Sequence, residues 1–188
     1  WDSVIGGTDS AETVKGLVFR GGTIYAGSTA RENSTAIGGG GNGFGDVKIH
    51  GGNITAVVYS TGTAIGGGIA HTGLGGSASV VINDGKVFAY NFGQPAHDVI
   101  SQYGSSATTE IIKAARHIAG TAIGGASSIM QSGNSSPADI TINGGYVYAE
   151  SLGGCAIGGG NSVCVTAGSA NVNINGGTVI ANSKGQDD

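Results

Sequence analysis

The sequence predicts an all-β protein, a parallel β-solenoid (β-helix) of about six rungs of ~30 residues each. Three observations predict it. Glycine makes up 39 of the 188 residues, two short glycine-containing motifs recur along the chain, and the residues around the second motif alternate between apolar and polar. A repeat that cannot bury its own apolar face must stack on its neighbours. We therefore expect one β-solenoid repeat domain over residues 1–188.

The first motif is a tight turn in which isoleucine precedes two glycines. It recurs at Ile5, Ile37, Ile65, Ile123 and Ile157, which lie 32, 28, 58 and 34 residues apart. The interval of 58 is close to two periods and predicts a further unit between Phe92 and Gly120. Apolar residues at 111, 112, 115 and 118 favour a short helix there. Residues 93–120 therefore hold either a degenerate rung or a helical insertion.

The second motif consists of two alternating apolar runs joined by a glycine pair, as in Ile-Asn-Gly-Gly-Thr-Val-Ile-Ala at 174–181. Side chains alternate across a strand, so we expect one column to point inward: Ile24, Ile54, Val87, Val147 and Val179. Glycine accepts positive φ without strain, which assigns the glycine pairs to corners: Gly21, Gly22, Gly51, Gly52, Gly144, Gly145, Gly176 and Gly177. Just before these corners, Asn83, Asn143 and Asn175 are expected to hydrogen-bond along the stack.

The glycine pair has an alternative interpretation as a two-residue hairpin turn. In that arrangement Ile49 would face Ile54 and Val47 would face Ala56, so the apolar pairing works equally well. The period of ~30 residues favours the parallel solenoid instead, because stacked repeats bury a continuous core.

Charge and hydropathy exclude several functional classes. The net charge is −4 and the eight basic residues are scattered, so no basic stripe exists to bind nucleic acid. The apolar runs are short and interrupted by glycine, which excludes a transmembrane helix. The chain begins at Trp1 and contains no signal-peptide apolar segment, so we expect a processed mature chain.

Groups that could carry catalysis do not converge in the sequence. The four histidines lie in four different contexts, and no G-x-S-x-G motif is present. Asp46 and Asp139 occupy the same repeat position and could form a carboxylate pair, but Ser79 and Asn171 occupy it in other copies. That position is better explained as a polar start of a strand. We predict no enzyme activity, no cofactor and no metal site.

The expected outer face carries aromatic residues. Tyr25, Phe88 and Tyr148 fall in one column, and Tyr146 falls in the neighbouring one. Such an apolar strip could stabilise contacts between rungs, pack against another subunit or stack on sugar rings.

Two further residue types are candidates for covalent modification. Cys155 and Cys164 are disulfide candidates, either within the chain or between chains. Candidate sites for N-glycosylation are Asn33, Asn53 and Asn134.

The Ala-Ile-Gly-Gly-Gly turn at 156–160 and the Ile-Asn-Gly-Gly-Thr-Val-x-Ala run at 174–181 carry a family resemblance. They resemble the Gly-rich repeats of secreted microbial surface proteins, which are predicted to be right-handed β-helices. The resemblance covers the chain except for about residues 93–120. It implies an extracellular, cell-surface location, in adhesins, in carbohydrate-binding modules or beside polysaccharide-degrading domains. A small chain of repeats also looks like the building block of a sheath, as in methanogenic archaea.

No convincing cap is recognisable at either end of the repeats, which run from Val4 to Ala181. Uncapped strand edges promote open-ended pairing, and identical chains that join head to tail form rings, tubes or filaments. We therefore expect a self-assembling structural protein of an extracellular layer, sheath or filament, whose partner is itself. The alternative is a cell-surface polysaccharide-binding module that uses the aromatic column.

Overall fold

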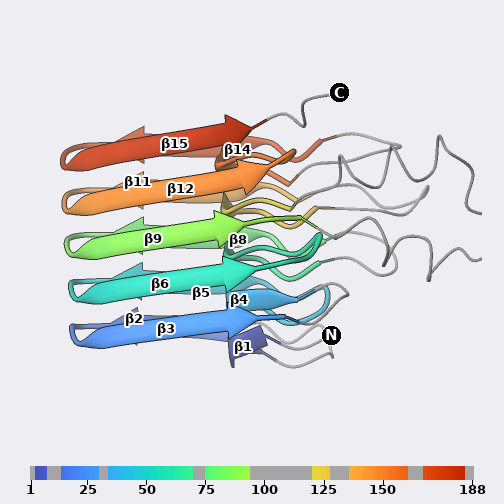
Figure 1. Ribbon diagram of the computed structural model, residues 1–188, viewed down its shortest axis with the longest axis horizontal. Coiled ribbons are helices and arrows are strands. Elements are labelled where there is room, and N and C mark those ends of the chain that lie inside the picture. The colour runs from blue at the N-terminus through green and yellow to red at the C-terminus, as the bar shows by residue number, and fades with distance from the viewer. Residues whose placement is uncertain are drawn as a thin grey trace, which may run out of the picture.

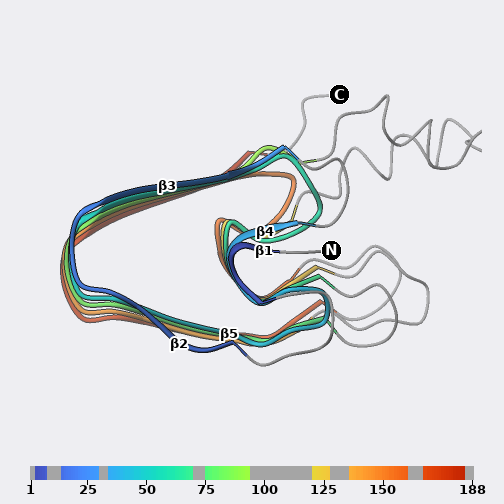
Figure 2. The same ribbon diagram turned by 90° about the horizontal axis from the view of Figure 1, so that it is seen from below.

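The chain winds into a parallel β-solenoid in which three sheets run along the axis (Figure 1). This computed structural model describes residues 3–7, 14–29, 34–69, 75–93, 120–127, 136–160 and 167–184. Viewed along the axis, two of the sheets form the two long sides, and the third lies between their ends on one side (Figure 2). The predicted fold class is confirmed, and the number of sheets is three.

Each sheet contains five parallel strands, one from each circuit of the chain. Sheet A contains β1 (Ser3–Gly6), β4 (Thr35–Gly38), β7 (Ile65–Gly66), β10 (Ile123–Gly124) and β13 (Ile157–Gly158). Sheet B contains β2 (Val14–Phe19), β5 (Gly45–Ile49), β8 (Ala78–Ile82), β11 (Ala138–Ile142) and β14 (Ala170–Ile174). Sheet C contains β3 (Thr23–Ser28), β6 (Asn53–Val58), β9 (Lys86–Asn91), β12 (Tyr146–Leu152) and β15 (Thr178–Lys184). We call the three strands of one circuit a rung, so that rung 1 is β1–β3 and rung 5 is β13–β15.

The strands on either side of each glycine pair belong to different sheets. β5 and β6 flank Gly51 and Gly52, yet β5 pairs with β2 and β8, whereas β6 pairs with β3 and β9. The hairpin alternative is therefore wrong, and the glycine pair is a corner between sheets B and C. Equivalent residues pair in register from rung to rung, as Ile37 does with Ile65 and Ile65 with Ile123.

The number of turns is smaller than the sequence spacing predicts. Five strands per sheet correspond to about four complete turns between the first and last strand, so about six rungs is wrong. Ile65 pairs directly with Ile123, and β9 pairs directly with β12. The long interval is therefore an insertion between two neighbouring rungs and adds no strand to the three sheets. Residues 94–119, including the predicted helix, lie outside the described residues, and the described part of the chain contains no helix.

Inward-facing isoleucine, valine and alanine side chains form the core. Ile54, Val87 and Val147 of sheet C are almost completely buried, as the alternation predicts, while Ile24 and Val179 of the end rungs are partly buried. Small and β-branched side chains suit this thin interior, because they fill a flat space between sheets without long flexible chains. In the part of the chain that the structure describes, each end rung is covered by strands on one side only, which explains its lower burial.

In rungs 3, 4 and 5, polar side chains close the circuit where sheet C ends. Asn91 donates from Nδ2 to the carbonyl of Gly62 at 2.6 Å, and Ser151 donates to the carbonyl of Gly120 at 2.8 Å. Ser183 makes the equivalent bond to Gly154. Each acceptor lies about one circuit earlier in the chain, so these bonds tie the end of a rung to its beginning.

Within the described residues, no helix is long and apolar enough to cross a membrane.

Candidate functional site

The outward face of sheet C holds the aromatic residues that the sequence singled out. Register pairs Tyr25 with Thr55, Thr55 with Phe88, Phe88 with Tyr148 and Tyr148 with Ile180. Phe88 and Tyr148 are therefore direct neighbours, while Thr55 separates Tyr25 from them. Tyr146 occupies the neighbouring column, with its ring centroid 5.8 Å from that of Phe88.

The aromatic surface is larger than the predicted column. Tyr90 lies on the same face of β9 as Phe88, and its ring is 5.7 Å from that of Tyr148. Phe92 stacks on Tyr90 at 5.7 Å with an interplanar angle of 10°. It also contacts Tyr59 at 5.1 Å. We define the aromatic cluster as these rings together: Tyr59, Phe88, Tyr90, Phe92, Tyr146 and Tyr148.

Sequence reasoning missed three members of this cluster, Tyr59, Tyr90 and Phe92. Tyr90 could have been found, because it follows Phe88 by two residues and must share its face of the strand. Burial raises the pKa of the Tyr90 hydroxyl, and Tyr148 and Glu150 nearby add to the effect. The phenol of Tyr90 therefore stays protonated well above neutral pH and can act as a hydrogen-bond donor.

Tyr25 lies apart from the cluster on rung 1. A Cβ added to Gly27 would lie 2.9 Å from its ring atom Cε1, so the ring lies over that glycine. The side chain is 72% exposed. The absence of a side chain at position 27 leaves the space that the ring occupies.

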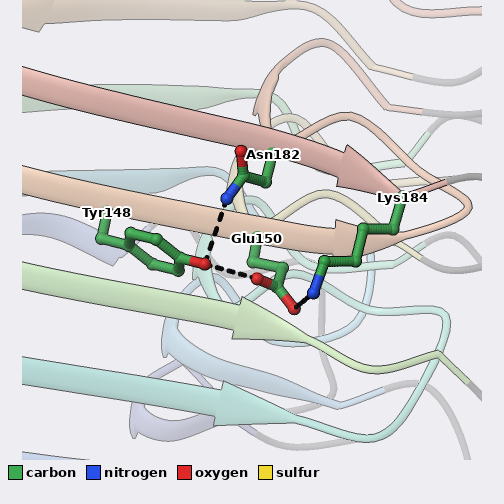
Figure 3. Close-up of polar contacts among 4 residues, drawn as sticks. All are labelled: Tyr148, Glu150, Asn182 and Lys184. Atoms are coloured by element: carbon green, nitrogen blue, oxygen red, sulfur yellow. Dashed lines mark hydrogen bonds and ion pairs between the residues drawn. The ribbon is translucent and has the colours of Figure 1, made fainter.

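A polar network borders the aromatic cluster at the end of β12 (Figure 3). The hydroxyl of Tyr148 donates to Glu150 Oε2 at 2.5 Å, and Lys184 Nζ approaches Glu150 Oε1 at 2.9 Å. Asn182 donates from Nδ2 to the oxygen of Tyr148 at 3.1 Å. Both oxygens of the Glu150 carboxylate are thus occupied although the residue is 7% exposed.

The network shifts the pKa of both charged groups. The hydrogen bond from Tyr148, followed by that from Lys184, lowers the pKa of Glu150 from its ordinary value. The hydrogen bond and charge of Glu150 raise the pKa of Lys184. At neutral pH the pair is therefore a fully ionised carboxylate and ammonium, placed beside flat aromatic rings.

A shallow hollow lies where the corner meets sheet C. Lys86 and Tyr146 border it together with Asn53, one of the glycosylation candidates, and the corner glycines form its floor. Asn53 is exposed at the start of β6 and can be reached from solvent. The other two candidates, Asn33 and Asn134, lie outside the described residues.

Exposed large apolar side chains concentrate at the two ends of the solenoid. Rung 1 carries Val4, Val18 and Tyr25, and rung 5 carries Val172 and Ile174, which are 39% and 55% exposed. Tyr59 in the middle is the remaining one among the described residues. Val172 and Ile174 occupy inward columns whose members in earlier rungs, such as Ile140 and Ile142, are completely buried.

The predicted asparagine ladder runs along the outside of the corner. Asn175 donates from Nδ2 to Asn143 Oδ1 at 2.8 Å, and Asn143 donates in the same way to Asn83 at 2.8 Å. Two members were not foreseen. Asn83 Nδ2 contacts His50 Nδ1 at 3.0 Å, and Arg20 holds the equivalent position on rung 1, because Phe19 pairs with Ile49.

The corner glycines divide into two kinds. The second glycine of each pair has positive φ, from 82° at Gly145 to 99° at Gly52, whereas the first has not. Asp84 takes the first place in rung 3, where its carboxylate accepts a hydrogen bond from the Gly85 amide at 2.7 Å. Positive φ therefore explains the second glycine alone.

The remaining candidates do not form a site. Cys155 carries a free thiol, and Cys164 lies outside the described residues, so the disulfide stays a prediction. Desolvation by neighbouring groups raises the pKa of Cys155, which disfavours the reactive thiolate. Ser79 lies between Asp46 and Asp139 in the register, so the two carboxylates are not neighbours. The described residues contain no group of three or more histidine, cysteine or acidic side chains placed to hold a metal ion.

Comparison with protein-family models, with curated protein sequences and with solved structures gives no significant match for this chain. The assignment of the fold as a β-solenoid therefore rests on the three sheets and in-register strands of the chain itself. What it does must therefore be inferred from its own geometry.

Proposed function

We propose that this chain is a self-assembling structural protein of an extracellular layer, sheath or filament. One observation carries the proposal: exposed large apolar side chains of the described residues concentrate on the first and last rungs. Among the described residues, the strands at both ends of all three sheets also lack a neighbouring strand on one side. Unpaired edges combined with exposed apolar side chains are a template for pairing with another chain. The extracellular setting rests on the resemblance to secreted surface repeats.

Sedimentation velocity and negative-stain microscopy over a concentration series test this function. We expect species larger than a monomer that grow with protein concentration and form ordered fibres or tubes. Ile174→Lys should abolish them, because a charge would replace an exposed apolar side chain at the end of β14. Asn173→Lys, on the outward face of the same strand, is the matched control and should still assemble. A wild-type chain that stays monomeric at every concentration would refute the proposal.

A second candidate function is binding of a cell-surface polysaccharide by the aromatic cluster. The observation that favours it is the Glu150 network beside the rings. Aromatic faces can stack on the apolar faces of sugar rings, while the exposed Lys184 ammonium and the Asn182 amide offer hydrogen bonds to hydroxyls. This combination of an apolar platform and a few fixed polar groups is typical of ligand sites.

Glycan-array screening followed by titration calorimetry tests this second function. Tyr148→Ala should remove binding, because it deletes a ring of the cluster and a hydrogen-bond partner of Glu150. Tyr25→Ala changes a tyrosine on the same face outside the cluster and should leave binding unchanged. Tyr148→Phe separates the roles of ring and hydroxyl. Equal loss in Tyr148→Ala and Tyr25→Ala would argue against the cluster as the binding surface.

A further inference from the structure

We propose that copies of this chain stack head to tail, with rung 5 of one copy pairing in parallel register with rung 1 of the next. This inference rests on the proposed assembly and names its partner, a second copy, and its polarity. All three sheets are parallel, so each end of the solenoid presents one strand from each sheet, in the same order and the same direction. A further rung can therefore be added to rung 5 without changing any strand direction.

The inward columns match across such a junction. Following the register along sheet B, Val172 belongs to the column of Leu17, and Ile174 belongs to the column of Phe19. In sheet C, Val179 belongs to the column of Ile24. All of these side chains are apolar and at most partly buried in the single chain. Head-to-tail stacking would continue three apolar columns of the core from one copy into the next.

The outward face of sheet C matches as well. Tyr25 and Ile180 are the first and last members of one column. In a head-to-tail stack the ring of Tyr25 from the next copy would lie beside Ile180. Aromatic residues next to β-branched residues stabilise adjacent strands. The exposure of the Tyr25 ring is thereby explained by a contact that one chain cannot make.

The asparagine ladder gives the junction its direction. Every amide in it donates toward the preceding rung, so the last oxygen, Asn175 Oδ1, accepts no hydrogen bond from a described residue. At the other end the position belongs to Arg20, whose guanidinium has donors and no acceptor. Stacking head to tail places the donors of Arg20 against Asn175 Oδ1. The two ends therefore complement each other in hydrogen bonding as well as in shape.

Joining two like ends does not offer this match. A two-fold axis that brings two copies of rung 5 together reverses the direction in which the chain runs around the solenoid. The three sheets then cannot all continue across the junction. Such a contact would also bring two Asn175 acceptors to one junction with no Arg20 donor.

The edge of rung 1 limits where pairing can start. The register of β2 against β5 shifts between Val14 and Leu17, where Gly16 has φ 73°. Bulges and similar irregularities on edge strands interrupt pairing. We therefore expect β14 of the neighbouring copy to pair with Leu17–Phe19, the segment that stays in register with β5.

Cysteine cross-linking tests this polarity. In a Cys155→Ser, Cys164→Ser background, we would prepare Arg20→Cys and Asn175→Cys as separate full-length variants. Neighbouring strands lie about 4.8 Å apart, within the Cα separation of about 4.4–6.8 Å that a disulfide allows. We expect a disulfide-linked dimer only when the two variants are mixed. A chain carrying both changes should give a ladder of covalent multimers under non-reducing conditions.

The outcomes separate this inference from the proposed function. Dimers in either variant alone, or sedimenting oligomers without any cross-link, would overturn the head-to-tail junction while assembly stands. If the protein that carries only Cys155→Ser and Cys164→Ser is monomeric at all concentrations, both the head-to-tail junction and the proposed assembly are overturned. Arg20→Ala provides a second readout, because loss of a charged hydrogen-bond donor should raise the critical concentration for assembly about tenfold or more. An unchanged critical concentration would contradict the Arg20–Asn175 contact.

Discussion

At the scale of single residues, the two glycines of each corner have different physical roles. Gly52 has φ 99°, and a Cβ there would lie 2.6 Å from the carbonyl oxygen of Gly22 in the rung below. Gly51 lacks positive φ, and an added Cβ would meet only the Arg20 carbonyl oxygen at 3.6 Å, an ordinary contact. Gly51 is therefore replaceable, as Asp84 illustrates at the same place in rung 3. In rungs 4 and 5 the first glycine is needed for space, because an added Cβ would lie 2.7 Å from the Asn83 carbonyl oxygen at Gly144 and 2.8 Å from that of Asn143 at Gly176.

Gly52→Ala should destabilise the protein by about 2 kcal/mol or more, because it combines backbone strain with a steric clash. Gly51→Ala should change the free energy of unfolding by no more than about 1 kcal/mol in either direction. Urea unfolding followed by circular dichroism measures both. Equal destabilisation by the two substitutions would contradict the different roles.

Glu150 makes a contribution to the free energy of unfolding that depends on pH. Because its pKa is lower in the folded chain than in the unfolded one, its contribution is fully present above the unfolded pKa. The contribution is lost as pH falls through the lowered folded value. Lys184 behaves oppositely: its pKa is raised, so its contribution is present below the unfolded value and is lost as pH rises through the folded one.

We therefore expect wild-type protein to lose more stability than Glu150→Gln when pH is lowered from neutrality through the acidic range. The physical reason is that glutamine cannot titrate, so this part of the pH dependence disappears. Melting temperatures measured across the acidic range by scanning calorimetry would show the difference. Parallel curves for the two proteins would mean that Glu150 does not titrate differently on folding.

The sequence predicted part of the candidate site at this scale. The column of Tyr25, Phe88 and Tyr148 followed from period-two alternation around equivalent corners, and the structure confirms its register. The contact of Glu150 with Lys184 could not be predicted, because Lys184 reaches it from the next rung and a different column. Such diagonal contacts depend on side-chain conformation, which periodicity does not encode.

At the scale of the element, each strand of sheet C must end in a way that starts the next circuit. Asn91 does so while completely buried: besides its bond to Gly62, its Oδ1 accepts from the Gly93 amide at 3.0 Å. Ser151 takes the same register position on β12 and closes its own circuit through the Gly120 carbonyl. Val58 holds this register position in rung 2, so the position accepts an apolar residue, and the polar closure belongs to rungs 3 and 4.

Asn91→Ala should destabilise the protein by about 2–4 kcal/mol, because it leaves a buried carbonyl and a buried amide without their partner. Asn91→Ser, which introduces the residue found in the next rung, should recover part of this loss. Asn173→Ala, on the exposed face of β14, is the control and should change stability by less than about 0.5 kcal/mol. Chemical denaturation of the three variants measures these differences. If Asn173→Ala lowers the free energy of unfolding as much as Asn91→Ala does, the burial of Asn91 does not explain its effect.

Element types were predictable from the sequence, but their number was not. Alternation around Gly51–Gly52 is equally compatible with a hairpin and a corner, and the repeat period decided correctly for the corner. The same period predicted an extra rung between Ile65 and Ile123, but these residues pair directly although they lie 58 residues apart. An insertion of about one period has the same length as a missing rung, and spacing cannot distinguish the two.

At the scale of the whole molecule, the solenoid is nearly one-dimensional, because each rung contacts only its neighbours. Stability in such molecules is the sum of the intrinsic stabilities of the rungs and the interfaces between them. Rungs 2, 3 and 4 have an interface on both sides, whereas rungs 1 and 5 have an interface on one side. Local opening should therefore begin at the ends.

Hydrogen exchange should show this gradient. In dilute, monomeric protein, we expect the amides of β14 to exchange faster than those of β11, although both strands belong to sheet B. Under assembling conditions the difference should shrink, because β14 gains a second neighbour. Peptide-resolved mass spectrometry can follow both strands. Equal protection of β11 and β14 in the monomer would show that the solenoid opens as one cooperative unit.

The constant register of the three sheets also determines how such a molecule can change in length. A complete circuit inserted between two rungs would lengthen the axis by about 4.8 Å, and it would leave rung 1 and rung 5 as they are. A change of half a circuit would instead alter which sheet comes last. Duplication or deletion of whole circuits can thus change the length of a subunit while its two end surfaces are preserved. A subunit of the new length could therefore still stack on subunits of the original length.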